Sequence, residues 1–125
     1  MTKRLELYKC EICGNIVQVM HEGAGELVCC GKPMTKLEPH FTEEGMDEKH
    51  IPVFTDNNTI AVGSIPHPMI KEHYIEFIQC MTPDKNFIQT KFLLPEQSPE
   101  MELSPQKYNI AREYCNIHGL WANKD

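Results

Sequence analysis

The sequence contains the stretch CEICGNIVQVMHEGAGELVCCG at residues 10–31, which holds four of its six cysteines. Two residues separate Cys10 from Cys13, so both sulfurs can reach one ion around a tight turn, and the glycine that follows lets the backbone curl beneath it. Cys29 and Cys30 are adjacent, so the backbone must twist to aim both sulfurs inward, and we expect a distorted tetrahedron. Four thiolates suit iron or zinc, and the spacing does not separate these metals.

The chain around these cysteines is predicted to form short strands and turns. Residues 5–8 alternate like a strand, residues 16–20 are β-branched, and the glycines of residues 23–25 indicate a turn. A module of residues 1–38 is too small for a useful core, so it needs a metal, a disulfide or a partner chain. The N-terminus does not resemble a signal peptide, which favours a reducing compartment and therefore metal over a disulfide.

Composition indicates a folded, soluble protein rather than a disordered or membrane-spanning one. The 125 residues are 24% charged and 41% hydrophobic, and no apolar run approaches the ~20 residues that span a bilayer. The net charge of −6 argues against nucleic acid and anionic membranes as partners. Residues 39–125 carry the whole net charge, with seven basic and thirteen acidic side chains. Residues 1–38 carry five of each. We expect a cytoplasmic location.

The second module is predicted to be rich in strands. The candidates are residues 51–54, 59–62, 74–81, 86–94 and 107–114. Turn signals at residues 56–58 and 83–86 separate some of them, and this spacing predicts an antiparallel sandwich or barrel. The acidic residues 43–48 are expected to form a loop or a short helix.

A second set of metal-binding side chains lies in this module. Cys115 and His118 form a C-x-x-H pair that can reach one ion, and His67 and His73 flank a loop that could close over it, with His50 nearby. One thiolate and several imidazoles suit iron, copper or zinc. The alternative is a set of unrelated histidines and a buried cysteine.

Three further side chains have simpler interpretations. Cys80 lies in an apolar strand and is expected to be a core thiol, while His21 and His40 are expected at the surface.

Together these motifs resemble the desulfoferrodoxins, the two-iron form of the superoxide reductases. The N-terminal cysteines are similar to a desulforedoxin-type iron site. The superoxide reductase motifs are Glu48-Lys49-His50, Gly63-Ser-Ile-Pro-His67-Pro-Met, His73-Tyr74-Ile75 and Ala111-Arg-Glu-Tyr-Cys115-Asn-Ile-His118-Gly-Leu-Trp121. The resemblance covers essentially the whole chain.

The resemblance implies an all-β fold. A small desulforedoxin-like metal module (residues 1–38) would precede an immunoglobulin-like antiparallel β-sandwich (residues 39–125). It also implies two iron ions per chain. The first would be bound by Cys10, Cys13, Cys29 and Cys30, and the second by four equatorial imidazoles and one axial thiolate, from His50, His67, His73, His118 and Cys115.

The implied activity is the one-electron reduction of superoxide to hydrogen peroxide, with electrons from rubredoxin or a similar donor, in a homodimer. Lys49 would attract the anionic substrate, and Glu48 can occupy the sixth position of the oxidised iron in the family. One alternative is a rubredoxin-like electron carrier with a structural metal in the second module. Another is a structural zinc protein that binds a partner through its N-terminal module.

Overall fold

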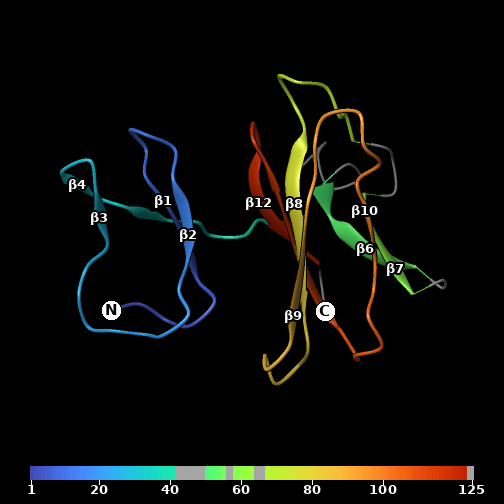
Figure 1. Ribbon diagram of the computed structural model, residues 1–125, viewed down its shortest axis with the longest axis horizontal. Coiled ribbons are helices and arrows are strands. Elements are labelled where there is room, and N and C mark those ends of the chain that lie inside the picture. The colour runs from blue at the N-terminus through green and yellow to red at the C-terminus, as the bar shows by residue number, and fades with distance from the viewer. Residues whose placement is uncertain (42–49, 56–57, 64–66, 124–125) are drawn as a thin grey trace. The chain divides into compact units, whose positions relative to one another are not determined.

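The computed structural model describes residues 1–41, 50–55, 58–63 and 67–123, which form two compact units, Met1–Glu38 and Pro39–Asp125. Twelve strands are the regular elements of this described part of the chain (Figure 1). The predicted all-β fold, with a small N-terminal module followed by an antiparallel β-sandwich, is therefore confirmed. No helix within these ranges is long and apolar enough to cross a membrane.

The first unit is built from two small antiparallel sheets. One has the order β2-β1-β5 and the other pairs β3 with β4. Their bounds are Leu7–Lys9 (β1), Ile16–Gln18 (β2), Val28–Cys29 (β3), Lys32–Pro33 (β4) and Thr35–Lys36 (β5). The buried apolar side chains of this unit are Leu5, Leu7, Val19 and Cys10. So small a core agrees with the expectation that the unit needs a further source of stability.

Both cysteine turns have the backbone that their sequence predicts. Gly14 has a φ of 87°, in the left-handed region that glycine adopts without strain, and its N–H donates to the Cys10 carbonyl at 2.9 Å. Cys30 has a φ of 54°, which is uncommon for a residue with a side chain. This left-handed residue is the backbone twist expected of the adjacent cysteine pair.

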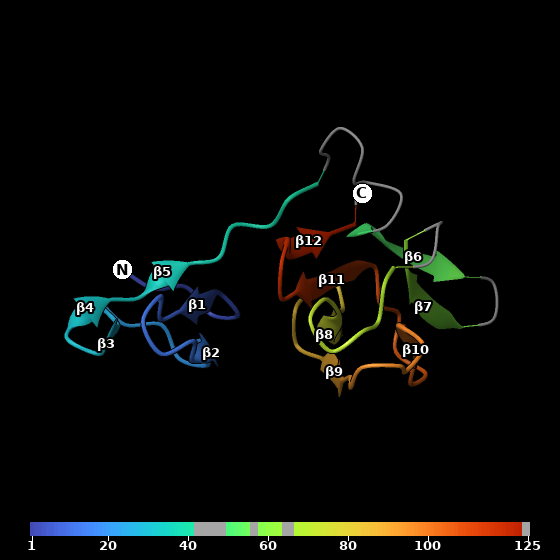
Figure 2. The same cartoon turned by 90° about the horizontal axis from the view of Figure 1, so that it is seen from above.

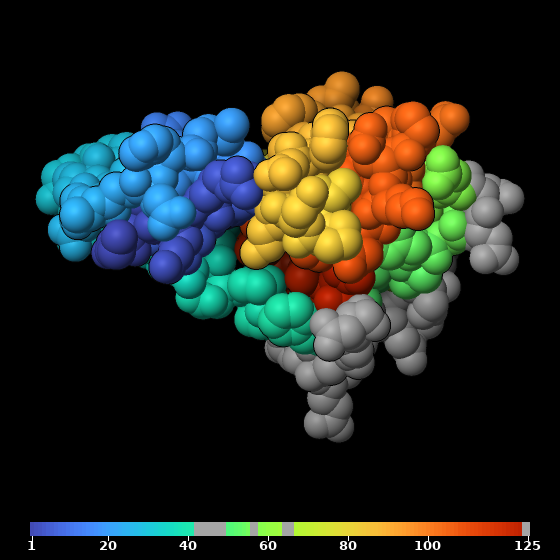
Figure 3. Space-filling view, turned by 90° about the horizontal axis from the view of Figure 1, so that it is seen from below, coloured from blue at the N-terminus to red at the C-terminus, as the bar shows by residue number. Residues whose placement is uncertain are grey.

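The second unit is a sandwich of two antiparallel sheets. Its strands are Pro52–Thr55 (β6), Thr59–Val62 (β7), Ile75–Met81 (β8), Ile88–Phe92 (β9), Glu100–Glu102 (β10), Ile110–Cys115 (β11) and Gly119–Ala122 (β12). The sheet orders are β10-β7-β6 and β12-β11-β8-β9, and Figure 2 shows them as two layers. Buried Ile60 and Met101 from one sheet pack with Ile78 and Ala111 from the other. The β9 region, yellow to orange in Figure 3, lies at the surface of this unit.

Most strands of this unit were predicted, but β10 and β12 were not. β10 has only three residues, of which Met101 alone is buried, so its pattern is too short to recognise. β12 begins at Gly119, a residue that weakens a strand pattern. The turn at residues 83–86 is confirmed by the Lys85 N–H, which donates to the Thr82 carbonyl at 2.9 Å. Residues 43–48 and 56–57 lie outside the described residues.

Candidate metal centres

The four N-terminal cysteines converge in the first unit. Their ligand atoms all lie within 4.8 Å of one another, and all six cysteines of the chain are free thiols. The Sγ atoms of Cys13 and Cys29 are 3.5 Å apart, and those of Cys29 and Cys30 are 4.0 Å apart. Two sulfurs about 2.3 Å from one ion at the tetrahedral angle are about 3.8 Å apart, so these separations fit a four-thiolate metal site.

The electrostatics of this cluster show why it needs a cation. Backbone N–H groups of Cys13 and Ile12 lower the pKa of Cys10 to about 6. Hydrogen bonds with the neighbouring sulfurs of Cys13 and Cys10 raise the pKa of Cys30 to about 12, and the charge of the Cys10 thiolate adds repulsion in the same direction. A bound metal ion removes this repulsion, and binding is therefore coupled to the loss of the thiol protons.

The second cluster forms at one end of the sandwich, where strands begin or end. His50 precedes β6, His73 precedes β8, Cys115 is the last residue of β11, and His118 immediately precedes β12. His67 lies between β7 and β8. Their ligand atoms also lie within 4.8 Å of one another, and the cluster is largely buried. Two sheets therefore fix a site that is assembled from chain segments 68 residues apart.

The four imidazoles of this cluster form a closed square. Going round it, the ring centroids are 4.6 Å apart for His50 and His67, 4.8 Å for His67 and His73, 4.9 Å for His73 and His118, and 4.7 Å for His118 and His50. Each ring is steeply inclined to its neighbours, at 66° to 80°. Four rings in this arrangement can aim four nitrogens at one point.

The nitrogen separations indicate an ion bound at right angles. His50 Nε2 is 3.0 Å from His67 Nε2 and 3.1 Å from His118 Nδ1. Two nitrogens about 2.1 Å from one ion are about 3.0 Å apart at a right angle and about 3.4 Å apart at the tetrahedral angle. These two separations from His50 are closer to the right-angle value than to the tetrahedral one, and fit neighbouring positions around a five- or six-coordinate ion.

Hydrogen bonding and burial prepare the imidazole of His67 to bind metal. The Nδ1 atom of His67 lies 2.6 Å from the Pro68 carbonyl, which can only accept, so Nδ1 carries the proton and the Nε2 lone pair faces the cluster. Burial lowers the pKa of His67 to about 4, so the ring is neutral at physiological pH. Neutral imidazole is the form that metals bind.

The Cys115 sulfur is held beside this square. Cys115 is fully buried, and its Sγ lies 3.8 Å from His118 Nδ1. Burial raises the pKa of Cys115, while hydrogen bonds from the backbone N–H groups of His118 and Ile117 act in the opposite direction. The His118 N–H reaches the sulfur at 3.5 Å. The Asn116 N–H does not add to these bonds, because it donates to the Tyr74 carbonyl at 3.2 Å.

Asn116 connects the two loops that carry Cys115 and His73. Its side-chain oxygen accepts from the Tyr74 N–H at 2.9 Å, and its side-chain amide donates to the Glu72 carbonyl at 3.1 Å. One asparagine thus holds the backbone on both sides of His73. Sequence analysis missed this role because the bonded residues are 42 and 44 positions apart in the chain.

Replacing Asn116 with alanine is expected to weaken metal binding at the second cluster by about tenfold or more, the usual cost of losing a group that orients ligands. Zinc affinity measured by competition with a chromogenic chelator tests this, with the four-cysteine cluster as an internal reference. Asn86→Ala is the matched control, because the Asn86 amide bonds Asp84 in the turn after β8. Equal affinities in both variants would show that the Asn116 bonds do not support the site.

The other sequence-predicted residues are placed as follows. Cys80 is fully buried in the core, where burial raises its pKa to about 11, and His21 is exposed, as expected. His40 is exposed, as expected, but its ring also contacts Trp121. Glu48 and Lys49, the predicted catalytic residues, lie outside the described residues.

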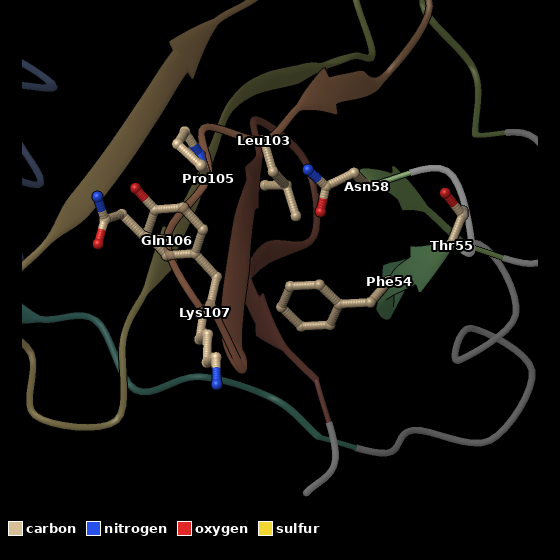
Figure 4. Close-up of a pocket in the computed structure, with 8 residues that line it drawn as sticks. Phe54, Thr55, Asn58, Leu103, Pro105, Gln106 and Lys107 are labelled. Atoms are coloured by element: carbon tan, nitrogen blue, oxygen red, sulfur yellow. The ribbon is translucent and has the colours of Figure 1, made fainter.

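A hollow of about 600 Å³ lies elsewhere in the second unit (Figure 4). Phe54, Leu103 and Tyr108 line it together with the Lys107 side chain, and none of the nine clustered cysteines and histidines does. The two clusters of metal-binding side chains are therefore separate from this hollow.

Comparison with known proteins identifies the family. The family described as "Desulfoferrodoxin, N-terminal domain" matches residues 2–37, and the family described as "Desulfoferrodoxin" matches residues 42–124. The chain belongs to the desulfoferrodoxin family. A desulfoferrodoxin of Syntrophotalea carbinolica is 46% identical over 131 residues, covering 99% of each chain. The desulforedoxin of Megalodesulfovibrio gigas is 53% identical over 36 residues, covering 29% of this chain and 97% of that protein.

Among solved structures, the superoxide reductase from Treponema pallidum superposes with a TM-score of 0.74 and 28% identity, covering 99% of this chain and 100% of that one. The two donor sets of this desulfoferrodoxin family member, four thiolates and four imidazoles with one thiolate, match the two-iron desulfoferrodoxins. Iron is therefore the metal that both clusters fit, and zinc or copper need not be invoked.

Proposed function

We propose that this chain is a superoxide reductase, which reduces superoxide by one electron to hydrogen peroxide with the uptake of two protons. The observation that carries the proposal is the square of four imidazoles joined by one buried thiolate, because five protein ligands leave one position of an octahedral ion for substrate. The superposition on the Treponema pallidum superoxide reductase over nearly the whole chain supports it.

The protein residues would have distinct tasks in this reaction. We propose His50, His67, His73, His118 and Cys115 as the ligands of the catalytic iron, which when bound would supply the electron. The Pro68 carbonyl keeps the His67 ring in the tautomer that faces the metal, and the His118 N–H moderates how strongly the Cys115 sulfur donates electron density. Asn116 holds the backbone of His73 in place for the same purpose.

We propose Lys49 and Glu48 as the further catalytic residues, on the basis of their place directly before His50 in the sequence. A net charge of −6 repels an anionic substrate at long range, but salt screens this repulsion beyond about 8 Å. Local positive charge therefore decides capture, and Lys49 would provide it. Glu48 would interact with the oxidised site and is not expected to be the essential proton donor.

Replacing Lys49 with isoleucine is expected to slow the second-order reaction with superoxide severalfold or more, because the local attraction for the anion is lost. Pulse radiolysis at fixed ionic strength measures this rate. Lys91→Ile removes the same charge from the exposed part of β9 and controls for the change in net charge. Equal rates for the two variants would remove Lys49 from the mechanism.

The remaining assignments concern the first centre and the partners. We propose that residues 1–38 and 39–125 act as separate domains, and that Cys10, Cys13, Cys29 and Cys30 bind the first iron. The electron donor would be rubredoxin or a similar small redox protein. Homodimer formation and a cytoplasmic location complete the proposal.

Metal content, the visible spectrum and the reaction with superoxide test the proposed function together. We expect two irons per chain, a red rubredoxin-like oxidised centre, a second centre with a thiolate charge-transfer band, and rapid oxidation of that second centre by superoxide. One iron with no reaction would instead indicate an electron carrier, and a colourless zinc protein would indicate a structural role.

A further inference from the structure

We propose that electrons from a small redox protein reach the second centre through three rings in sequence, those of His40, Trp121 and His50, with His40 as the ring at the surface. The inference rests on the proposed function, because it concerns the step that returns the catalytic iron to its ferrous state. It assigns a role to His40 and Trp121, which the ligand set does not use.

The three rings form a continuous path from solvent to the metal ligands. The ring of exposed His40 is centred 5.0 Å from that of Trp121, at an interplanar angle of 40°. Trp121 is fully buried and stacks on His50, with a centroid distance of 4.8 Å and an angle of 21°. His50 in turn presents Nε2 to the cluster. Electron tunnelling falls steeply across unfilled space, so packed aromatic rings favour it.

Backbone and side-chain hydrogen bonds hold these rings in place. The His40 N–H donates to the Leu120 carbonyl at 2.8 Å, and the Ala122 N–H donates to the His40 carbonyl at 3.0 Å, so His40 pairs in parallel beside Trp121 at the edge strand β12. The Trp121 indole N–H donates to the His118 carbonyl at 3.1 Å. Trp121 therefore contacts two of the proposed iron ligands.

The surface beside His40 suits a transient redox partner. Phe41, the next residue, is 49% exposed, so consecutive residues expose an imidazole and an uncharged ring. Transient complexes between redox proteins bury less than about 1,200 Å² of surface, so a small exposed area is enough for docking. We therefore assign the surface around His40 and Phe41 to a one-electron donor whose metal lies close to the donor's surface, as in rubredoxin.

The transfer balances without bond formation. One electron leaves the reduced donor, whose metal is oxidised by one unit, and reduces the ferric ion of the second centre to ferrous. No proton or atom is exchanged in this step.

Nuclear magnetic resonance tests the docking without turnover. The chain has one tryptophan, so a ¹⁵N-labelled, zinc-loaded sample gives one indole N–H signal. Titration with zinc-loaded rubredoxin is expected to shift this signal and the amides of His40 and Phe41, and His40→Ala is expected to raise the dissociation constant severalfold. Shifts confined to other surfaces would overturn the proposal.

Stopped-flow reduction of the iron-loaded chain tests the route. Two rates are measured for the second centre, one for reduction by reduced rubredoxin and one for reduction by dithionite. We expect the ratio of the rubredoxin rate to the dithionite rate to fall severalfold in His40→Ala. His21→Ala, which removes an exposed imidazole from the first unit, is expected to keep the original ratio. An unchanged ratio in His40→Ala, or no transfer from rubredoxin to the unaltered chain, would reject the route. Loss of the superoxide reaction in a prereduced sample would instead reject the proposed function.

Discussion

Replacing Cys115 with serine is expected to abolish the thiolate charge-transfer band of the second centre and to lower its metal affinity by more than about 100-fold. Losing a group that merely orients a ligand costs about 10–100-fold, so losing a ligand must cost more. Burial raises the pKa of the Cys115 thiol, so a bound cation is needed to keep it as thiolate. A serine hydroxyl in the same buried position ionises far less readily.

Cys80→Ser is the matched control for this variant. Cys80 is also fully buried in the same sandwich, on the neighbouring strand β8, but it belongs to the apolar core. Its replacement is expected to lower the free energy of unfolding while leaving the charge-transfer band in place. Visible absorption and zinc competition, measured on both variants, test whether the Cys115 sulfur is a ligand. A surviving band in Cys115→Ser would exclude the Cys115 sulfur as a ligand.

The two clusters differ in how far local sequence could predict them. Cys10 and Cys13 are close along the chain, and turn geometry alone brings their sulfurs together. His50 and His118 meet only because β6 and β12 begin at the same end of the sandwich, so spacing left them ambiguous and the resemblance to a family was needed.

The residues that support the ligands could not be predicted from the sequence, because they too act through long-range contacts. Asn116 and Trp121 act through contacts with segments that are distant in the chain, and nothing in their immediate sequence marks such a contact. His40 shows the limit most clearly. Its exposure was predicted correctly, yet its contact with Trp121 depends on a backbone pairing with β12 that the sequence did not predict. Residue type and spacing thus indicate ligands better than they indicate the groups that position them.

Removing metal from the first centre is expected to unfold Met1–Glu38 while the sandwich stays folded. The free energy of binding a structural metal in so small a module is largely folding free energy. Only a few apolar side chains of this unit are buried, whereas the sandwich has a continuous core between two sheets. Cys13→Ser produces this state selectively, because Cys13 belongs to the first cluster alone.

Amide hydrogen exchange on Cys13→Ser would measure the unfolding, with protection expected to disappear over β1 and β2 and to persist over β8 and β11. The red absorption of the first centre should be lost, while the charge-transfer band of the second centre and its oxidation by superoxide continue. Persistent protection in the first unit would mean that its own packing suffices to fold it. If the second centre instead stopped reacting with superoxide, the first iron would be a required part of the reaction, because the ligands of the second centre are all outside Met1–Glu38.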